Sequence, residues 1–148
     1  MGIHDISSSG SIITILTVPT FPQGFEVTTL PGDSDPLDFG DRQIGDYEMG
    51  ANGDLIYWNT PRGIEITLNV VPGSEDDQNL GILLDVNTVG KNKASARDLI
   101  TLIQTKPDGT KTVFSNGKIL SGAPASGFNA ASRFKTKQYR FVFEKKAN

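Results

Sequence analysis

Residues 64–90 read IEITLNVVPGSEDDQNLGILLDVNTVG, and this stretch places a predicted strand directly before a predicted helix. Apolar residues occupy every second position from Ile64 to Val70, so an extended chain puts them on one face and the polar residues on the other. That alternation predicts a half-buried β-strand. Pro72 and Gly73 should end the strand, because proline lacks the backbone donor that a sheet needs and glycine permits the bend.

A helix is predicted to begin at Ser74, whose side chain can accept hydrogen bonds from the free backbone N–H groups of the first turn. Asp77 is spaced to reach back as in a capping box, and the two acids before it suit the positive end of the helix dipole. Leucines at helical spacing form a stripe that must pack on something, and Gly90 is placed to terminate the helix. We therefore expect one flanking helix at about 74–89, packed on a sheet.

The rest of the chain alternates strand-like stretches with turn signals, and no repeat or linker divides it. The expected strands are rich in β-branched and aromatic residues and are bounded by Gly, Pro and Asn. They cover 11–18, 25–30, 43–49, 54–59, 98–105, 110–115, 118–120 and 133–144, besides the strand in 64–90. This pattern predicts one domain, residues 1–148, that is mainly β: a β-sandwich or partly closed barrel of about eight strands with one flanking α-helix.

The dipeptide Asn52-Gly53 predicts a hairpin turn between the strands at 43–49 and 54–59, because both residues tolerate positive φ. Trp58, the only tryptophan, follows Tyr57 in the second strand. Adjacent strand residues face opposite ways, so we expect one ring to point inward and the other to be more exposed. The alternative is a carbohydrate-binding β-sandwich module, which requires both rings to be exposed together.

Composition excludes several kinds of site. The 148 residues include no cysteine, which rules out disulfides, cysteine zinc sites and thiol nucleophiles and fits a reducing place of synthesis. The one histidine, His4, falls in the serine-rich segment 1–10, which we expect to be a flexible arm, so neither a Ser-His-Asp triad nor a histidine metal cluster is expected. We expect no enzyme activity, metal or cofactor, and a hydrolase with paired carboxylates is the least favoured alternative. Neither a signal peptide nor a membrane-spanning run is visible, which predicts a soluble, unprocessed chain.

Residues 31–42 are predicted to form a long acidic loop that also contains Leu37 and Phe39. Apolar side chains in a solvated loop either fold back on their own domain or dock on another subunit, and the sequence leaves both open. The net charge is −3, but acids are concentrated in 26–85 and Lys and Arg from residue 91 onward. Such polarity can bring copies of one protein together head to tail, although a solvated surface is the commoner explanation.

Two runs together carry a family resemblance. IGDYEMGANGDLIYW, residues 44–58, is a polar hairpin that ends in an aromatic pair, and IEITLNVVPGSEDDQNL, residues 64–80, is the strand with its capped helix. In this order and spacing they resemble the tail tube proteins of contractile-tailed bacteriophages of the myovirus type. The resemblance runs over about residues 11–145, and 33–90 is its specific part.

The resemblance implies a structural virion protein of the phage tail, made in the host cytoplasm. Six copies would close into a ring, and rings would stack into the inner tube that conducts DNA during ejection. The implied partners are further copies in stacked hexameric rings, the tail sheath protein, a baseplate hub or initiator and the tape measure protein inside the channel. DNA would be present only in transit, and no membrane binding is implied. A tube-like component of the baseplate or tail end shares the fold and is the alternative.

Within this resemblance, the acidic loop 31–42 is expected to reach the next ring, the arm 1–10 is the second candidate, and the basic link 91–97 is the expected acceptor. The candidate contact residues are Asp33, Asp35, Leu37, Asp38, Phe39, Asp41, Lys91, Lys93 and Arg97. Carboxylates on a channel wall would repel phosphates and let DNA slide. The candidate lumen-facing acids are Glu26, Glu48, Asp54 and Glu65, unless these face solvent or pair with neighbouring cations.

Overall fold

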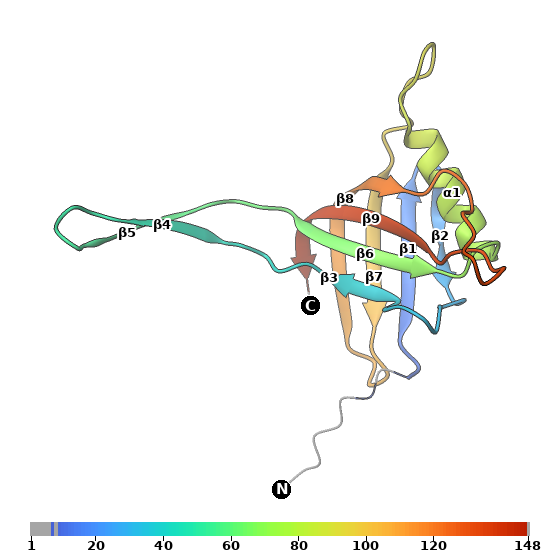
Figure 1. Cartoon of the computed structure of the whole chain (residues 1–148), viewed down its shortest axis with the longest axis horizontal. Coiled ribbons are helices and arrows are strands. Elements are labelled where there is room, and N and C mark those ends of the chain that lie inside the picture. The colour runs from blue at the N-terminus through green and yellow to red at the C-terminus, as the bar shows by residue number, and fades with distance from the viewer. Residues whose placement is uncertain (1–6, 8, 148) are drawn as a thin grey trace, which may run out of the picture.

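The computed structural model describes residues 7 and 9–147 and shows a curled antiparallel sheet with one helix packed against it (Figure 1). Its strands are β1 (Ile12–Val18), β2 (Phe21–Val27), β3 (Leu37–Phe39), β4 (Gly45–Met49), β5 (Leu55–Asn59), β6 (Ile64–Val70), β7 (Leu99–Thr105), β8 (Lys111–Gly122) and β9 (Lys137–Ala147). The helix, α1, spans Glu75–Asn87. The expectation of a mainly β chain with one flanking helix is confirmed. His4 and most of the predicted arm lie outside the described residues.

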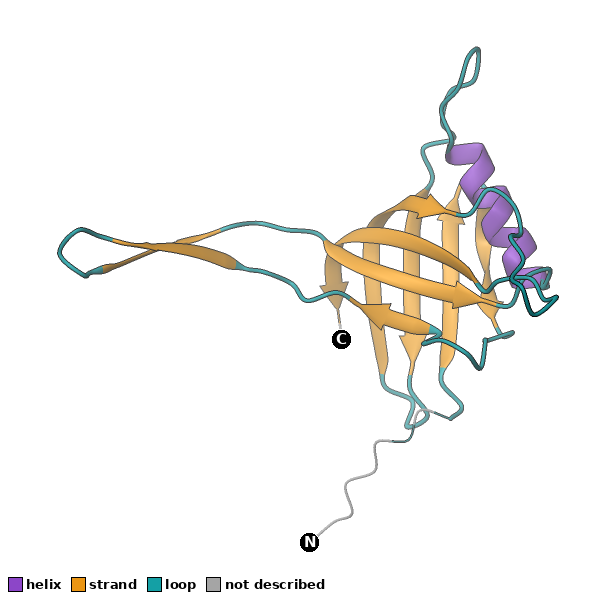
Figure 2. Cartoon of the chain, in the orientation of Figure 1, coloured by secondary structure: helices purple, strands orange, loops and turns teal. Residues whose placement is uncertain are grey.

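Seven strands form one sheet in the order β2-β1-β7-β8-β9-β6-β3, and each neighbouring pair is antiparallel. The longest strands, β8 and β9, lie near its middle, and their register shifts between Ile119 and Ser121. A second register shift lies in the pairing of β7 with β8 near Asn116, whose φ is 54°. Such irregularities bend a sheet and increase its twist. The sheet therefore curls until β6 and β9 lie in front of β1 and β7, giving a sandwich-like layer pair that does not close into a barrel (Figure 2).

The core fills the inside of this curl. The predicted inner face of β6, Ile64 to Val70 at alternate positions, is at most 7% exposed. Tyr139, Phe141 and Phe143 of β9 are buried beside it, as their alternation predicts. The remaining buried apolar residues come from β1, β2, α1, β7 and β8 and are Ile13, Ile15, Val27, Leu80, Leu83, Ile100, Leu102 and Phe114.

Two glycines of β8 make room for the large rings of β9. Gly117 pairs with Phe143 and Gly122 pairs with Tyr139. A Cβ atom at Gly122 would lie 2.6 Å from the Tyr139 ring, and one at Gly117 would collide with the Phe143 ring. Bare backbone at these positions therefore lets both rings lie across the neighbouring strand inside the core.

The N-terminus of α1 is capped nearly as predicted. The Ser74 hydroxyl accepts the backbone N–H of Asp77 at 3.2 Å, and the Asp77 carboxylate accepts the N–H of Gly73 at 2.8 Å. The C-terminus differs, because the helix ends at Asn87 with Thr88 as its cap. Side chains of these two residues donate to the Leu83 and Leu84 carbonyls at 2.8 and 2.7 Å, which satisfies the last turn before Gly90 is reached. The prediction that Gly90 terminates the helix is therefore wrong.

Two acids of the first helical turn join α1 to both sides of the sheet. Asp76 accepts the backbone N–H groups of Thr28 and Thr29, which follow β2, both at 2.8 Å. Asp77 accepts the Tyr139 hydroxyl at 2.8 Å and forms an ion pair with Lys137 at 3.2 Å. Burial, with the neighbouring Asp77 carboxylate, raises the pKa of Tyr139 above its usual value. These contacts hold the helix across the opening of the curled sheet.

Several strand boundaries differ from the sequence prediction. Within the predicted loop 31–42, Leu37–Phe39 form β3 and pair with β6. The stretches 110–115 and 118–120 form one strand with a bulge at Asn116. The last strand begins at Lys137, four residues later than predicted. No helix of the described residues is long and apolar enough to cross a membrane.

Truncating the helix stripe tests this packing. We expect Leu83→Ala to lower the free energy of unfolding by about 2–5 kcal/mol, because Leu83 is fully buried between α1 and the sheet. Ile82→Ala is the matched control on the same helix, since Ile82 is 48% exposed, and should cost less than about 0.5 kcal/mol. Urea denaturation measures both. Equal losses would contradict the packing described here.

The Tyr139 hydroxyl provides a pH-dependent test. At pH 7, Tyr139→Phe should lose about 1–2 kcal/mol, because it removes the bond to Asp77. The raised folded-state pKa means that this contribution is complete below the unfolded pKa of about 10 and is lost as pH rises toward the folded value. The difference in unfolding free energy between wild type and variant should therefore shrink from pH 8 to pH 11. A constant or growing difference would refute the assignment.

Candidate functional site

The hairpin of β4 and β5 projects away from the sheet as a two-stranded ribbon (Figure 1). Its tip confirms the predicted hairpin at Asn52-Gly53, although only Gly53 takes a positive φ, 83°. The Gly53 N–H donates to the Gly50 carbonyl at 2.9 Å, so the turn runs from Gly50 to Gly53. Thr60 continues the ribbon by donating its N–H to the Ile44 carbonyl at 3.0 Å. The ribbon is therefore regular in its backbone although it is not part of the large sheet.

The ribbon has two chemically different faces. Register pairs Tyr47 with Tyr57 and Met49 with Leu55, and alternation places these four on one uncharged face. The opposite face carries a second set: Asp46, Glu48, Ile56 and Trp58. The six large apolar side chains of the two strands are 44–66% exposed. An isolated two-stranded hairpin is marginally stable in water, and contiguous exposed apolar surface marks an interaction site.

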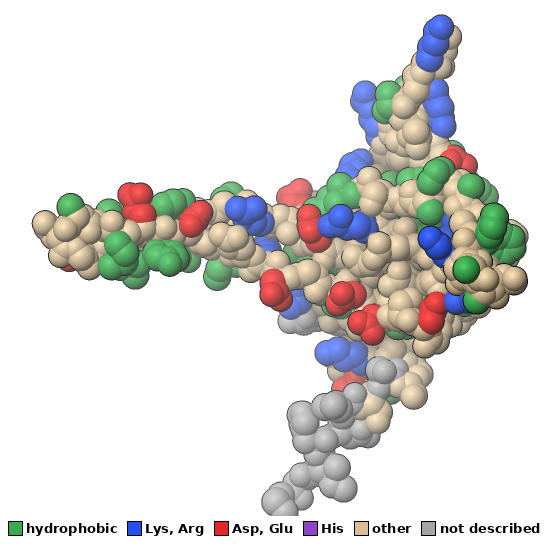
Figure 3. Space-filling model, viewed as in Figure 1, with side chains coloured by type: hydrophobic (Ala, Val, Ile, Leu, Met, Phe, Trp, Pro, Cys, Tyr) green, Lys and Arg blue, Asp and Glu red, His purple; other side chains and the backbone are tan. Residues whose placement is uncertain are grey.

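The charge of the ribbon is entirely acidic. Residues 43–60 contain Asp46, Glu48 and Asp54 but no Lys or Arg. Figure 3 shows hydrophobic side chains running along the hairpin with acidic ones beside them. A partner for this element would therefore offer apolar surface next to positive charge.

The expectation that Tyr57 or Trp58 points into the core is wrong. Both rings are exposed, because a two-stranded ribbon has no interior and neither of its faces meets the sheet. The rings also face opposite sides of the ribbon, so they do not form one stacking surface for a sugar. Exposure of both rings alone therefore gives no support to the carbohydrate-binding alternative.

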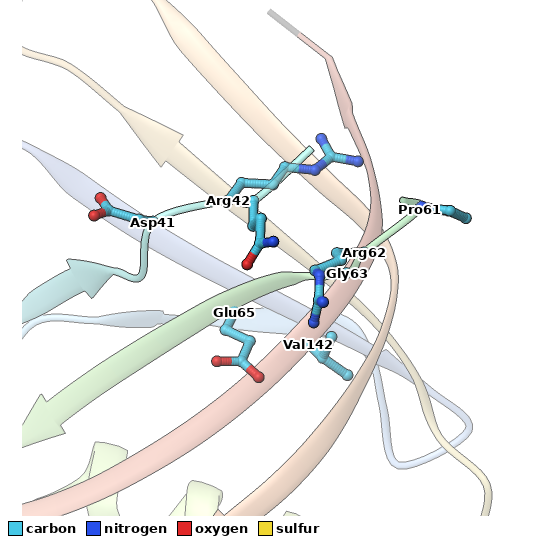
Figure 4. A pocket seen from close by; sticks show the side chains of 8 residues that line it. Asp41, Arg42, Pro61, Arg62, Gly63, Glu65 and Val142 are labelled. Carbon is cyan, nitrogen blue, oxygen red and sulfur yellow. The ribbon is translucent and has the colours of Figure 1, made fainter. Parts of the chain in front are cut away.

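A hollow of about 410 Å³ lies where the hairpin joins the sheet. Its walls include Asp41, Arg42, Arg62 and Glu65 (Figure 4). Asp41 is turned away from Arg62 and Glu65, so charges of both signs line the hollow without converging on one point. Within residues 7 and 9–147, no group of three or more His, Cys, Asp or Glu is arranged to hold a metal ion.

The acidic segment 31–42 is held against its own domain at several points. Asp33 forms an ion pair with Arg133 at 2.7 Å and accepts the Thr136 hydroxyl at 2.8 Å, and these hydrogen bonds lower its pKa. The Asp35 carbonyl accepts the side-chain amide of Asn69 at 2.6 Å. These two residues thus have partners within the chain.

The apolar residues of the same segment also contact their own domain. Leu37 pairs with Leu68 and packs on the core, and the Phe39 ring centroid lies 5.4 Å from that of Phe114. Phe39 nevertheless keeps 38% of its surface exposed. Asp38 and Asp41 are exposed as well. In the single chain, therefore, the segment folds back on its own domain. Its contact with another subunit stays a prediction.

The predicted basic acceptor lies elsewhere on the molecule. Lys91 and Lys93 belong to a tip in which Gly90 and Lys93 pair, and the Lys93 ammonium donates to the Asp85 carbonyl. Arg97 is exposed and its carbonyl accepts Lys118 at 3.2 Å. Figure 1 shows this tip projecting beyond α1, whereas 31–42 crosses the opposite side of the molecule. Within one chain the acidic segment and the basic link are therefore not brought together.

The four predicted lumen-facing acids lie on three separate parts of the fold. Glu26 is on β2 at one edge of the sheet, and Glu65 is on β6 near the other edge, with an ion pair to Arg140 at 3.3 Å. Glu48 and Asp54 belong to the hairpin. One chain does not gather these carboxylates on a single wall, and their role in a channel stays a prediction.

Comparison with known proteins gives a family and a fold. A family model described as Tail fiber protein gp32 matches residues 4–147. Comparison with curated protein sequences gives no match.

Solved structures similar to this chain include parts of an extracellular contractile injection system and of the anti-feeding prophage. A chain from the sheath/tube terminator of the extracellular contractile injection system PVC, in its extended state, is 16% identical with a TM-score of 0.54, and the match covers 98% of this chain and 96% of that one. A chain from the anti-feeding prophage cap, the AFP tube terminating cap, is 15% identical with a TM-score of 0.54 over 99% and 92%. A chain from the anti-feeding prophage baseplate is 10% identical with a TM-score of 0.54 over 99% and 96%. At these identities the likeness shows a shared fold.

The isolation of the hairpin predicts an unusual mutational result. We expect Ile56→Ser combined with Trp58→Ser to change the free energy of unfolding by less than about 1 kcal/mol, although both residues are large and apolar, because surface positions contribute little. Urea denaturation of dilute protein measures this change. A loss as large as that of Leu83→Ala would show that the hairpin packs on the domain in solution.

Proposed function

We propose that the chain, which belongs to the family described as Tail fiber protein gp32, is a non-catalytic structural protein that joins further copies of itself in a tail tube or tube-like ring. Family membership makes it a component of a phage-like tail, which is the broader part of the resemblance visible in the sequence. The tube itself, the hexameric ring and the passage of DNA are the finer part and belong to the proposal.

The exposed hairpin carries the proposal. Its six large apolar side chains find no core in their own chain, and burying them elsewhere removes apolar surface from water. A ribbon that extends from a compact sheet is suited to reach a neighbouring subunit, as strand and hairpin arms commonly do in assemblies. Among the elements of this chain it replaces the segment 31–42 as the first candidate for reaching the next subunit.

The predicted contact residues of 31–42 and of the basic link are the second candidates for contacts between copies. The exposed side chains of Asp38, Phe39 and Asp41 are available to another copy, and so are Lys91 and Arg97 on the opposite side of the molecule. When one side of a copy binds the opposite side of the next copy, each end of the assembly keeps a free surface for a further copy. Such a contact repeats, which favours rings or stacks. Asp33 is the weakest member of this set, because Arg133 and Thr136 already occupy its carboxylate.

Two positions in a tail are consistent with this assembly. The first candidate is the tube protein itself, with sheath, tape measure and initiator as neighbours and carboxylates such as Glu26 and Glu65 facing DNA in transit. The second candidate is a tube-like component at the tail end, and the described family together with the terminator, cap and baseplate structures favours it. Stacking distinguishes the two, because a tube protein repeats along the axis and an end component does not.

Negative-stain electron microscopy of the purified chain across a concentration series tests the proposal. We expect rings or hollow tubes from the wild type, and dispersed particles from Ile56→Ser combined with Trp58→Ser, because these changes remove apolar surface from the hairpin. Ile82→Ser, at an exposed position of α1, is the matched control and should assemble normally. Long tubes would support the tube and single rings the end component. A folded wild type that stays monomeric at every concentration would contradict self-assembly.

A further inference from the structure

A hollow of about 730 Å³ opens between the end of β7, the beginning of β8 and the end of β9. Hollows of about 300–1,000 Å³ are large enough to bury most of a drug-sized molecule, so this one can receive several side chains. We call it the basic groove. It is lined by Phe39, Arg42, Ile64, Gln104, Lys106, Thr110, Thr112, Phe114 and Lys146.

The floor of the basic groove is apolar. Ile64 and Phe114 belong to the core and expose only 7% and 4% of their surface, while Phe39 lies against Phe114 and stays 38% exposed. An apolar floor of this kind gains from contact with an apolar or aromatic side chain. The ring of Phe39 is the part of the floor that a partner can reach most easily.

The rim of the basic groove is positive. Arg42, Lys106 and Lys146 line it, and no aspartate or glutamate does. Within the described ranges, 7 and 9–147, none of these three cations forms a salt bridge. An occupant with carboxylates beside apolar side chains would therefore complement both the floor and the rim.

One face of the hairpin has this composition. Ile56 and Trp58 lie beside Asp46 and Glu48 on it, and no Lys or Arg lies in 43–60. The chain's own hairpin leaves the domain through Arg42 at the rim and extends outward, so the occupant must come from another copy (Figure 1). We name Asp46, Glu48, Ile56 and Trp58 the acidic face.

We propose that the acidic face of one copy docks in the basic groove of a second copy, with Ile56 and Trp58 on the apolar floor and the two carboxylates against the cations of the rim. This deepens the proposed function and rests on it, because it names the surface that receives the hairpin. Donor and acceptor are different surfaces of one chain, so each copy can bind one neighbour and receive another. The contact therefore propagates and builds a ring or a stack.

The fluorescence of Trp58, the only tryptophan, reports docking directly. Raising the concentration of the full chain should shift its emission to shorter wavelength as the indole leaves water, in step with assembly measured by light scattering. Emission at the shorter wavelength at every concentration would mean that the hairpin folds back on its own chain, and this result would overturn the proposal.

Charge reversal tests the groove itself. Lys106→Glu with Lys146→Glu should raise the concentration needed for assembly about tenfold or more, because like charges would face each other across the contact. Asp46→Lys with Glu48→Lys should have the same effect, and combining all four changes should restore assembly at least in part. Lys135→Glu, at an exposed lysine outside the groove, is the control and should change little.

The outcomes separate this inference from the proposed function. If the wild type assembles but Lys106→Glu with Lys146→Glu assembles equally well, the basic groove is not the acceptor and self-assembly stands. If both charge-reversed variants fail and the fourfold variant fails equally, with its fold intact by circular dichroism, the pairing of these two surfaces is refuted. If the wild type shows neither assembly nor a shift of Trp58 emission, both proposals fail.

Discussion

The structure depends on covering the inner face of a curled sheet with a single helix. β6 and β9 turn their apolar residues inward, and the leucines of α1 belong to the same core cluster. The buried Asp77 fixes this arrangement, because it caps the helix while it binds Tyr139 and Lys137 of β9. Removing one partner of such a buried network leaves the others without compensation. One helix covers only part of the opening, and the basic groove remains at the other end of β8 and β9.

Within the described part of the chain, the hairpin, in contrast to the sheet, has no element covering its apolar residues. A two-stranded ribbon has no interior, so its apolar residues stay in water until another surface covers them. The chain thus has a hairpin whose apolar residues lack a core, and a basic groove whose apolar floor is not covered. The acids of the donor and the cations of the groove rim add charge complementarity, which favours a defined register between copies over general adhesion. The physical basis of the proposed tail role is therefore that assembly covers apolar surfaces which a single copy leaves exposed.

Local features of the fold could be predicted because local chemistry specifies them. Alternation in β6 and β9, the Ser74 cap and the Asn52-Gly53 turn each depend on a few adjacent residues. The projection of the hairpin could not be predicted, because a strand's composition does not say whether a sheet lies beside it. Its clearest signal was Leu55 to Trp58, where apolar residues occupy both faces. The basic groove joins Phe39, Lys106 and Lys146 from distant parts of the chain, and only the sheet order brings them together.

Hydrogen–deuterium exchange of the dispersed and assembled chain tests most directly whether the hairpin is completed by another copy. In dispersed protein, amides of 45–59 should exchange rapidly while those of β6 and β9 are protected, because the free energy of local opening follows the surrounding packing. In assembled particles the hairpin amides should become protected by about tenfold or more, since docking of the acidic face holds the ribbon against a second copy and opposes the local opening that exchange requires. Strong protection of the hairpin in the dispersed chain, or none in the assembled particles, would contradict completion of the hairpin by another copy.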